Sequence, residues 1–237
     1  MRLPVALLAV AVVLTGCTGS DDGTGPPSPP TGDETGPLPA RLAVLADVPV
    51  PAFDPAAIVG WHREFVTTFV KRDSQSPTNL QAAEHIRSGL EQMGWLAEIR
   101  TYLPRPPQEV LPLPTDPTPG VGVRVVIGVK EGPNADHVVG WVSHYDTQTA
   151  TIEGAYDNGS GTAMALALAR ELAGYVNNKT LVVMFFDSEE IGLVASDYFV
   201  QTVVANDDAQ WDLVLGFDMV GINCPGHEWP LIALPNL

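Results

Sequence analysis

Cysteine, basic residues and long apolar runs are all scarce in this sequence of 237 residues, and each shortage excludes a class of protein. Two cysteines cannot build a disulfide framework, and no cysteine or histidine spacing matches a structural zinc finger. Twelve Lys and Arg stand against 28 Asp and Glu, and the formal net charge of −16 repels phosphate backbones without any basic cluster to offset it. We therefore expect no nucleic acid among the partners.

Only one long apolar run is present, at residues 3–14, and it is shorter than the ~20 residues that a transmembrane helix needs. Arg2 precedes it and Leu-Thr-Gly-Cys ends it, so residues 1–16 have the pattern of a secretory signal peptide. The ending at Cys17 resembles the bacterial lipobox, whose cysteine is lipidated and becomes the mature N-terminus. We expect Cys17 to anchor the exported protein to a membrane of the bacterial cell envelope, which is the outer membrane in a Gram-negative cell. A plain signal peptide, cut elsewhere, is the alternative.

A tether and a folded domain are expected to follow this signal. Residues 18–37 consist only of Gly, Pro, Ser, Thr, Asp and Glu, which offer no apolar surface to bury. We therefore expect residues 17–53 to be a disordered tether that begins with the lipidated cysteine. The folded domain is expected over residues 54–237.

From residue 54 onward, helical and strand patterns alternate, as in an α/β fold. Apolar residues recur at spacings of three and four over residues 78–93, where Thr78 and Gln81 have the spacing of a capping box. Three short apolar runs, at residues 138–142, 181–186 and 213–217, are typical of strands buried on both faces. Further helices are expected over 57–72 and 162–173, and further strands over 97–102 and 121–129. This order predicts a three-layer sandwich with a mostly parallel central sheet and helices on both faces.

Side chains with metal-binding chemistry follow all three apolar runs. In chain order they are His144, Asp146, Glu189, Glu190 and Asp218, and the loop 154–161 adds Asp157. Ligands of open α/β sheets bind beyond the carboxyl ends of the strands, so these groups are expected to share one crevice. The like charges would repel one another unless a cation neutralises them. Histidine and carboxylates without a thiolate favour zinc, with manganese or cobalt as alternatives. Taken singly, each acid also fits a solvated loop charge or, at Asp157, a helix cap.

Four ordered motifs give these residues a family context. Ser-His-Tyr-Asp, Tyr-Asp-Asn-Gly-Ser-Gly, Asp-Ser-Glu-Glu-Ile-Gly-Leu and Phe-Asp-Met-Val-Gly resemble the motifs of the M28 family of zinc metallopeptidases, which includes bacterial secreted aminopeptidases. The resemblance covers about residues 62–221. It implies that His144 and Asp218 bind one zinc ion, that Glu190 binds a second, and that Asp157 bridges both. It further implies that Glu189 is the general base and that Asp146 accepts the imidazole N–H of His144 and fixes its tautomer.

The resemblance also implies an activity, which is zinc-dependent release of N-terminal residues from peptides. Glu189 would take a proton from a metal-bound water molecule and pass it to the departing amine. Related M28 members act as carboxypeptidases or as glutaminyl cyclases, so these two reactions remain alternatives. Peptide substrates are the expected partners.

One part of the family pattern has no counterpart in the sequence. The fifth protein ligand of the family is a histidine well beyond the Asp218 motif, and the sequence ends at Leu237. His227 is not expected to replace it, because residues 223–226 have the pattern of a loop leaving the site. We therefore expect an M28-like fold whose C-terminal part is missing, with one of the family's two zinc ions lost. A non-catalytic or fragmentary M28-like scaffold is the alternative.

Overall fold

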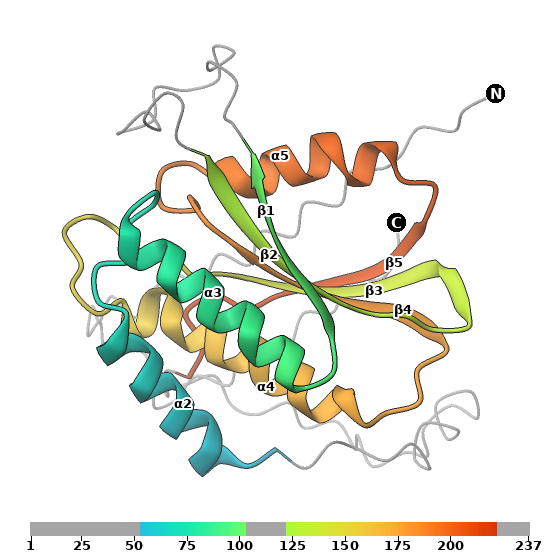
Figure 1. Ribbon diagram of the computed structural model, residues 1–237, viewed down its shortest axis with the longest axis horizontal. Helices are drawn as coiled ribbons and strands as arrows, with labels where there is room; N and C mark the ends of the chain where they lie inside the picture. Colours follow the sequence, from blue (N-terminus) through green and yellow to red (C-terminus); the bar gives the residue numbers. More distant parts are fainter. Residues whose placement is uncertain (1–52, 103–121, 222–237) are drawn as a thin grey trace, which may run out of the picture.

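A computed structural model describes residues 53–102 and 122–221 of the chain (Figure 1). These residues form a five-stranded sheet with helices packed against both faces, which confirms the α/β fold class. Cys17, residues 18–52 of the expected tether and His227 lie outside the described residues, so the lipid anchor stays a prediction. Within the described part, no helix is both long and apolar enough to cross a membrane.

The sheet has the strand order β1-β2-β4-β3-β5. The strands are β1 (Leu96–Tyr102), β2 (Val123–Lys130), β3 (Asn134–His144), β4 (Lys179–Phe186) and β5 (Gln210–Gly216). β3 lies between β4 and β5 and is parallel to both. β2 is antiparallel to both of its neighbours, β1 and β4, so it alone runs against the other four strands of the mostly parallel sheet. The reason is the short link 131–133, which reverses the chain between β2 and β3, whereas parallel neighbours need a longer crossover.

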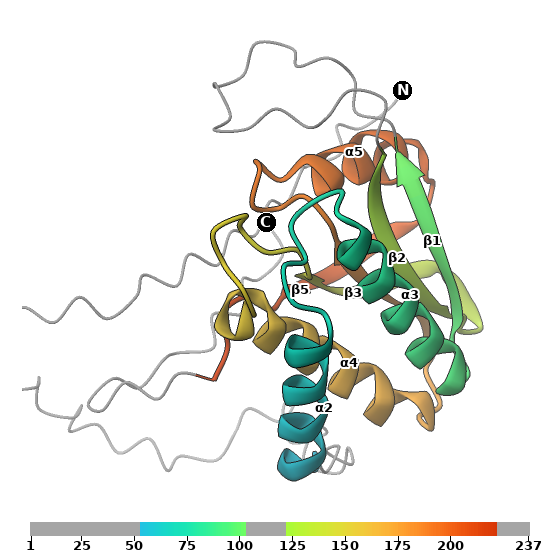
Figure 2. The same cartoon turned by 60° about the vertical axis from the view of Figure 1, so that its left-hand side comes forward.

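The helices cover the two faces of the sheet unequally (Figures 1 and 2). The first face carries α2 (Pro55–Thr68), α3 (Pro77–Gln92) and α4 (Gly161–Ala173), and the opposite face carries α5 (Val194–Thr202). β4 serves both cores because successive strand side chains alternate between faces. Val183 and Phe185 pack in the cluster on the side of α2, α3 and α4, whereas Met184 and Phe186 pack in the cluster on the side of α5. The continuous apolar run of β4 is thus explained by burial on both faces.

Two local expectations are wrong. α3 begins at Pro77, and its N-cap is Ser76, whose Oγ accepts a hydrogen bond from the Asn79 N–H at 3.0 Å. The expected capping box at Thr78 and Gln81 does not form, because proline occupies the first helical position and places Thr78 inside the first turn.

The third apolar run is also less buried than expected. β5 is half-buried or exposed along its length, because in the described part of the sheet it pairs only with β3.

Candidate metal centre

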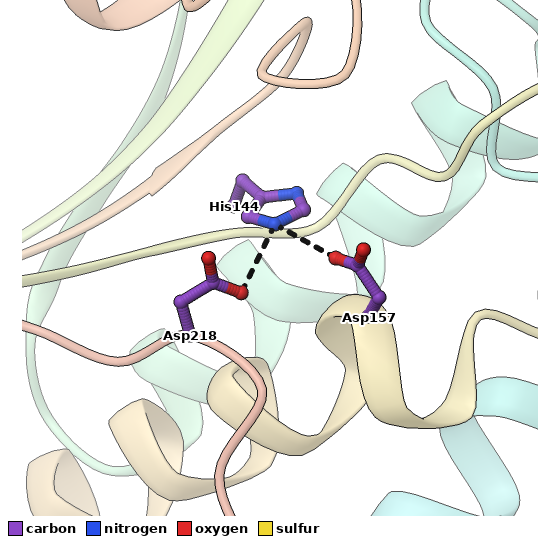
Figure 3. Close-up of side chains that lie close together, drawn as sticks. All are labelled: His144, Asp157 and Asp218. Atoms are coloured by element: carbon purple, nitrogen blue, oxygen red, sulfur yellow. Dashed lines mark ion pairs between the residues drawn. The ribbon is translucent and has the colours of Figure 1, made fainter. Parts of the chain in front are cut away.

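Three side chains from separate parts of the chain converge beyond the carboxyl ends of the parallel strands (Figure 3). His144 ends β3, Asp157 lies at the non-helical kink of the short segment η2 (Ala155–Ser160), and Asp218 follows β5 by two residues. His144 Nε2 lies 3.2 Å from Asp157 Oδ1 and 3.5 Å from Asp218 Oδ1. One ligand atom from each residue lies within 4.8 Å of the other two, so the three side chains together could hold one metal ion.

The imidazole is the buried part of this cluster, and the carboxylates form its open side. His144 is 6% exposed, whereas the side chains of Asp157 and Asp218 are 39% and 34% exposed. The Oδ1 atom of Asp218 is itself buried, and the described residues donate no hydrogen bond to it. A buried carboxylate oxygen without a hydrogen-bond donor, close to an imidazole nitrogen, is suited to a cation. The donor set therefore fits zinc.

Asp146 orients the imidazole from its other edge. Its Oδ1 lies 3.2 Å from His144 Nδ1, and since a carboxylate only accepts, Nδ1 carries the hydrogen and Nε2 is directed at the two aspartates. The same buried carboxylate accepts backbone hydrogen bonds from the N–H groups of Glu189 and Glu190, both at 3.2 Å. Asp146 thereby connects the imidazole to the turn that follows β4.

The carboxylates around His144 favour a positive charge at this position. Burial on its own lowers the pKa of His144, but the neighbouring carboxylates of Asp146, Asp157 and Asp218 outweigh burial and raise that pKa well above its usual value. The arrangement that favours a proton on the ring also favours a divalent cation, which would take the place of the proton on Nε2 and neutralise more of the negative charge.

Glu189 and Glu190 lie in the turn after β4, near the three clustered residues. Burial raises the pKa of Glu189, and the positive charge of His144 opposes that shift. Burial also raises the pKa of Glu190 to about 7, although a hydrogen bond from Gln148 acts in the opposite direction. Glu190 is not part of the cluster of ligand atoms, so three of the four expected metal ligands converge and Glu190 lies apart from them.

Asn158 connects the Asp157 turn to the loop that carries Asp218, and its role could not be predicted from the sequence. Asn158 is fully buried, its Nδ2 donates to the Phe217 carbonyl at 3.0 Å, and its Oδ1 accepts from the Met219 N–H at 3.2 Å. It thus holds the backbone on both sides of Asp218. The Asp157–Asn158 peptide bond is cis. The only sequence signal here is Asp-Asn-Gly, which is equally typical of an ordinary turn.

A second buried carboxylate, Asp187, directly follows β4 and precedes the two glutamates. Its Oδ1 accepts a hydrogen bond from Asn79 Nδ2 at 2.9 Å, and Arg124 Nη1 lies 3.9 Å from its Oδ2. Burial raises the pKa of Asp187 to about 7, the charge of Asp146 adds to the shift, and Arg124 opposes it. This network links α3, β2 and the end of β4.

Comparison with known proteins finds one family model that matches the part of the chain holding these ligands. Residues 125–231 match the family model described as Peptidase family M28. Over 201 residues the chain is 28% identical to leupeptin-inactivating enzyme 1 of Streptomyces exfoliatus, which covers 80% of this chain and 42% of that protein. Over 98 residues it is 34% identical to aminopeptidase YwaD of Bacillus subtilis, which covers 40% of this chain and 21% of that protein. The chain thus spans less than half the length of these two relatives.

Solved structures with a similar fold include a cyclase and a peptidase precursor. Glutaminyl cyclase of Porphyromonas gingivalis superposes with a TM-score of 0.61 and 19% identity, over 73% of this chain and 63% of that chain. A leucine aminopeptidase precursor from Bacteroides thetaiotaomicron gives a TM-score of 0.59 and 18% identity, over 73% of this chain and 64% of that chain. At these identities the likeness supports the fold alone.

Proposed function

Residues 125–231 match the model of peptidase family M28, and from that match we propose that the protein belongs to this family and is a zinc-dependent exopeptidase that releases N-terminal residues from peptides. The observation that carries the proposal is the convergence of His144, Asp157 and Asp218 close to the turn that holds Glu189. The relationship to an aminopeptidase supports cleavage at the N-terminus of the substrate.

We assign the three clustered side chains as zinc ligands. One imidazole and two carboxylates, His144, Asp157 and Asp218, are a suitable complement for a catalytic zinc ion, because three protein ligands leave a coordination position open. When bound, zinc polarises the substrate carbonyl and lowers the pKa of a water molecule. We assign Glu190, together with Asp157, as ligands of a second zinc ion.

Glu189 is the proposed general base. Its pKa is raised by burial, and a pKa closer to the working pH makes a carboxylate a better proton acceptor. Glu189 takes a proton from the attacking water as the new carbon–oxygen bond forms, and it returns the proton to the departing amine as the peptide carbon–nitrogen bond breaks. Asp146 positions this base, because it binds both the Glu189 N–H and the His144 ring.

The variant Glu189→Gln tests this assignment, because the amide keeps the shape of the side chain and removes its basicity. We expect turnover of amino-acid anilides to fall by about 10²–10⁴-fold, the usual range for loss of general acid–base catalysis. Zinc content should stay equal to that of the wild-type chain. Glu131→Gln, at an exposed residue directly after β2, is the matched control and should retain full turnover. Full turnover in Glu189→Gln would contradict the role of Glu189 as base.

A glutaminyl cyclase reaction is the second candidate, since the fold alone does not separate the two activities. A cyclase would close an N-terminal glutaminyl residue and release ammonia, whereas an aminopeptidase would release the free amino acid. Glutaminyl and leucyl peptides, assayed in parallel for ammonia and for free amino acids, distinguish the two. Ammonia as the sole product, from the glutaminyl peptide only, would replace the peptidase proposal with the cyclase.

A further inference from the structure

A buried arginine precedes α3 and lies outside the part of the chain that matches the family model. Arg72 is fully buried, and its guanidinium lies 4.8 Å from the ring centre of Phe65. All its hydrogen bonds go to backbone carbonyls. Nε donates to Tyr145 at 2.8 Å, Nη1 to Phe69 at 2.9 Å and to Glu153 at 2.8 Å, and Nη2 to Gly154 at 3.1 Å. Burying a cation costs free energy unless its N–H donors have acceptors, so these carbonyls must stay in place around the guanidinium.

The acceptors of these hydrogen bonds lie next to the candidate metal ligands in the chain. Tyr145 directly follows His144, and Glu153 and Gly154 shortly precede Asp157. The Gly154 carbonyl also accepts the Gly159 N–H at 2.9 Å, which closes the turn that contains Asp157. Arg72 therefore holds the backbone beside His144 and the backbone of the Asp157 turn in one fixed relation.

A histidine on α2 binds the next backbone carbonyl of this segment. His62 Nε2 lies 2.7 Å from the Ala155 carbonyl, and because a carbonyl only accepts, Nε2 carries the hydrogen and donates it. Arg72 and His62 thus hold three successive carbonyls, those of residues 153–155, just ahead of Asp157. Three successive carbonyls held from one side leave the start of the turn little freedom to move.

We propose that Arg72 and His62 are positioning residues of the metal centre, which fix the backbone of residues 153–155 so that Asp157 meets His144. α2 and the segment after it then belong functionally to the site, although no ligand comes from them. The inference rests on the proposed function, because it assumes that His144, Asp157 and Asp218 bind a metal ion. A merely structural role would lower stability without changing metal affinity, and this difference makes the proposal testable.

Cobalt(II) is the probe, since it occupies zinc sites and its visible absorption reports the geometry of its ligands. The full chain and the variants Arg72→Met and His62→Phe are titrated at one pH and well below their unfolding temperatures, with His144→Ala as the baseline for binding elsewhere. We expect each of the two variants to bind cobalt about 10–100-fold more weakly than wild type, the range typical when a partner that orients a metal ligand is lost. Arg72→Lys, which keeps the charge and part of the donor set, should recover part of the affinity and of the wild-type spectrum.

Lys130→Met is the matched control. Lys130 Nζ also donates to three backbone carbonyls, those of Leu172, Ala173 and Tyr175, but these lie at the C-terminal end of α4 and not at the metal centre. Its loss should lower the unfolding temperature and leave cobalt affinity within about twofold of wild type, because none of its acceptors adjoins a metal ligand.

The outcomes separate the inference from the proposed function. If the wild-type chain binds cobalt and both Arg72→Met and His62→Phe bind it with the same affinity, the inference is overturned, whereas the assignment of the metal centre is unaffected. A wild-type chain that binds no more cobalt than His144→Ala would overturn both. If Arg72→Met does not fold, the test rests on His62→Phe, because His62 is only half-buried on α2 and its replacement should disturb folding less. Unchanged cobalt affinity in His62→Phe would then overturn the proposal.

Discussion

Asp146 contacts both the His144 imidazole and the turn that holds Glu189 and Glu190. Its carboxylate is fully buried, faces the His144 ring with one oxygen, and accepts the N–H groups of Glu189 and Glu190 with both. Hydrogen bonds from three directions hold this buried carboxylate in one orientation. The imidazole and the proposed base are therefore held by the same carboxylate, and a shift of the Glu189 turn would be transmitted to the ring.

Asp187 makes the stability of the fold depend on pH. Burial raises its pKa from 3.8 to about 7, so between these values the native state binds more protons at this residue than the unfolded chain does. The native state is favoured most by this residue at low pH, and the free energy of unfolding falls as pH rises towards 7. The difference of about three pKa units sets an upper limit of about 4 kcal/mol on the effect.

The variant Asp187→Asn should therefore flatten the pH dependence of stability. The amide keeps an oxygen that can accept the Asn79 hydrogen bond and has no charge to desolvate. Compared with wild type, the variant should lose less stability between pH 5 and pH 8, as measured by urea unfolding at each pH. Asp208→Asn, at an exposed aspartate, should follow the wild-type curve. Parallel curves for Asp187→Asn and wild type would contradict the prediction.

At this scale the sequence pointed to the ligand types and to one supporting residue, Asp146, but not to the other supports. His144, Asp157 and Asp218 could be predicted because each follows a recognisable strand or precedes a helix in a known motif. Arg72 and Asn158 could not be predicted, because their hydrogen bonds go to backbone groups up to 82 residues away in the chain. Such contacts have no local pattern and exist only once the sheet and helices have assembled.

The N-terminus of α4, where η2 ends, helps to stabilise the negative charge of Asp157 at the candidate metal centre. η2 runs directly into α4 at Gly161, so Asp157 lies close to the N-terminus of a helix. The partial positive charge of a helix N-terminus favours carboxylates within about one turn. This placement offsets part of the repulsion between Asp157 and the other acids before any cation binds.

Ser76 is predicted to contribute to stability as the N-cap of α3. Its Oγ accepts the Asn79 N–H, one of the otherwise unpaired donors of the first turn. The variant Ser76→Ala should therefore lower the free energy of unfolding by about 1 kcal/mol. Thr78→Ala is the control, and as a change without a capping role it should stay within about 0.5 kcal/mol of wild type. Equal losses in both variants, measured by urea unfolding, would mean that the cap does not depend on Ser76.

The helices and strands differed in how well their patterns predicted them. β4 could be predicted because an apolar run bounded by polar residues has few other solutions in an α/β fold. α5 was not predicted, because it has nine residues, of which only Ala195 and Phe199 are buried, and so its apolar pattern is weak. The burial of β5 was overestimated, because a run of apolar residues does not show how many neighbouring strands cover it.

The whole molecule brings the ligands together through its connections. His144 comes from the middle strand of the parallel set, Asp218 from the loop after its neighbour β5, and Asp157 from the layer of helices on one face (Figure 3). An ion bound to all three would link the sheet to that layer. The parallel order that creates the site was predicted, whereas the antiparallel direction of β2 beside β4 was not, because it depends on the short link between β2 and β3.

This arrangement predicts that zinc stabilises the fold as a whole. The native state gathers the three ligands and the unfolded chain does not, so zinc should bind the native state preferentially. At free zinc about 100-fold above the dissociation constant, the free energy of unfolding should rise by about 2.7 kcal/mol, and a chelator should reverse the gain. Thermal unfolding with zinc and after chelation measures the difference.

The double variant Asp157→Asn, Asp218→Asn is the control for this prediction, because it leaves His144 Nε2 without the two carboxylates beside it. Its unfolding temperature should not respond to zinc. An equal response of variant and wild type would assign the effect to other acidic residues of a chain whose net charge is −16, and the convergence of His144, Asp157 and Asp218 would then not be a metal centre.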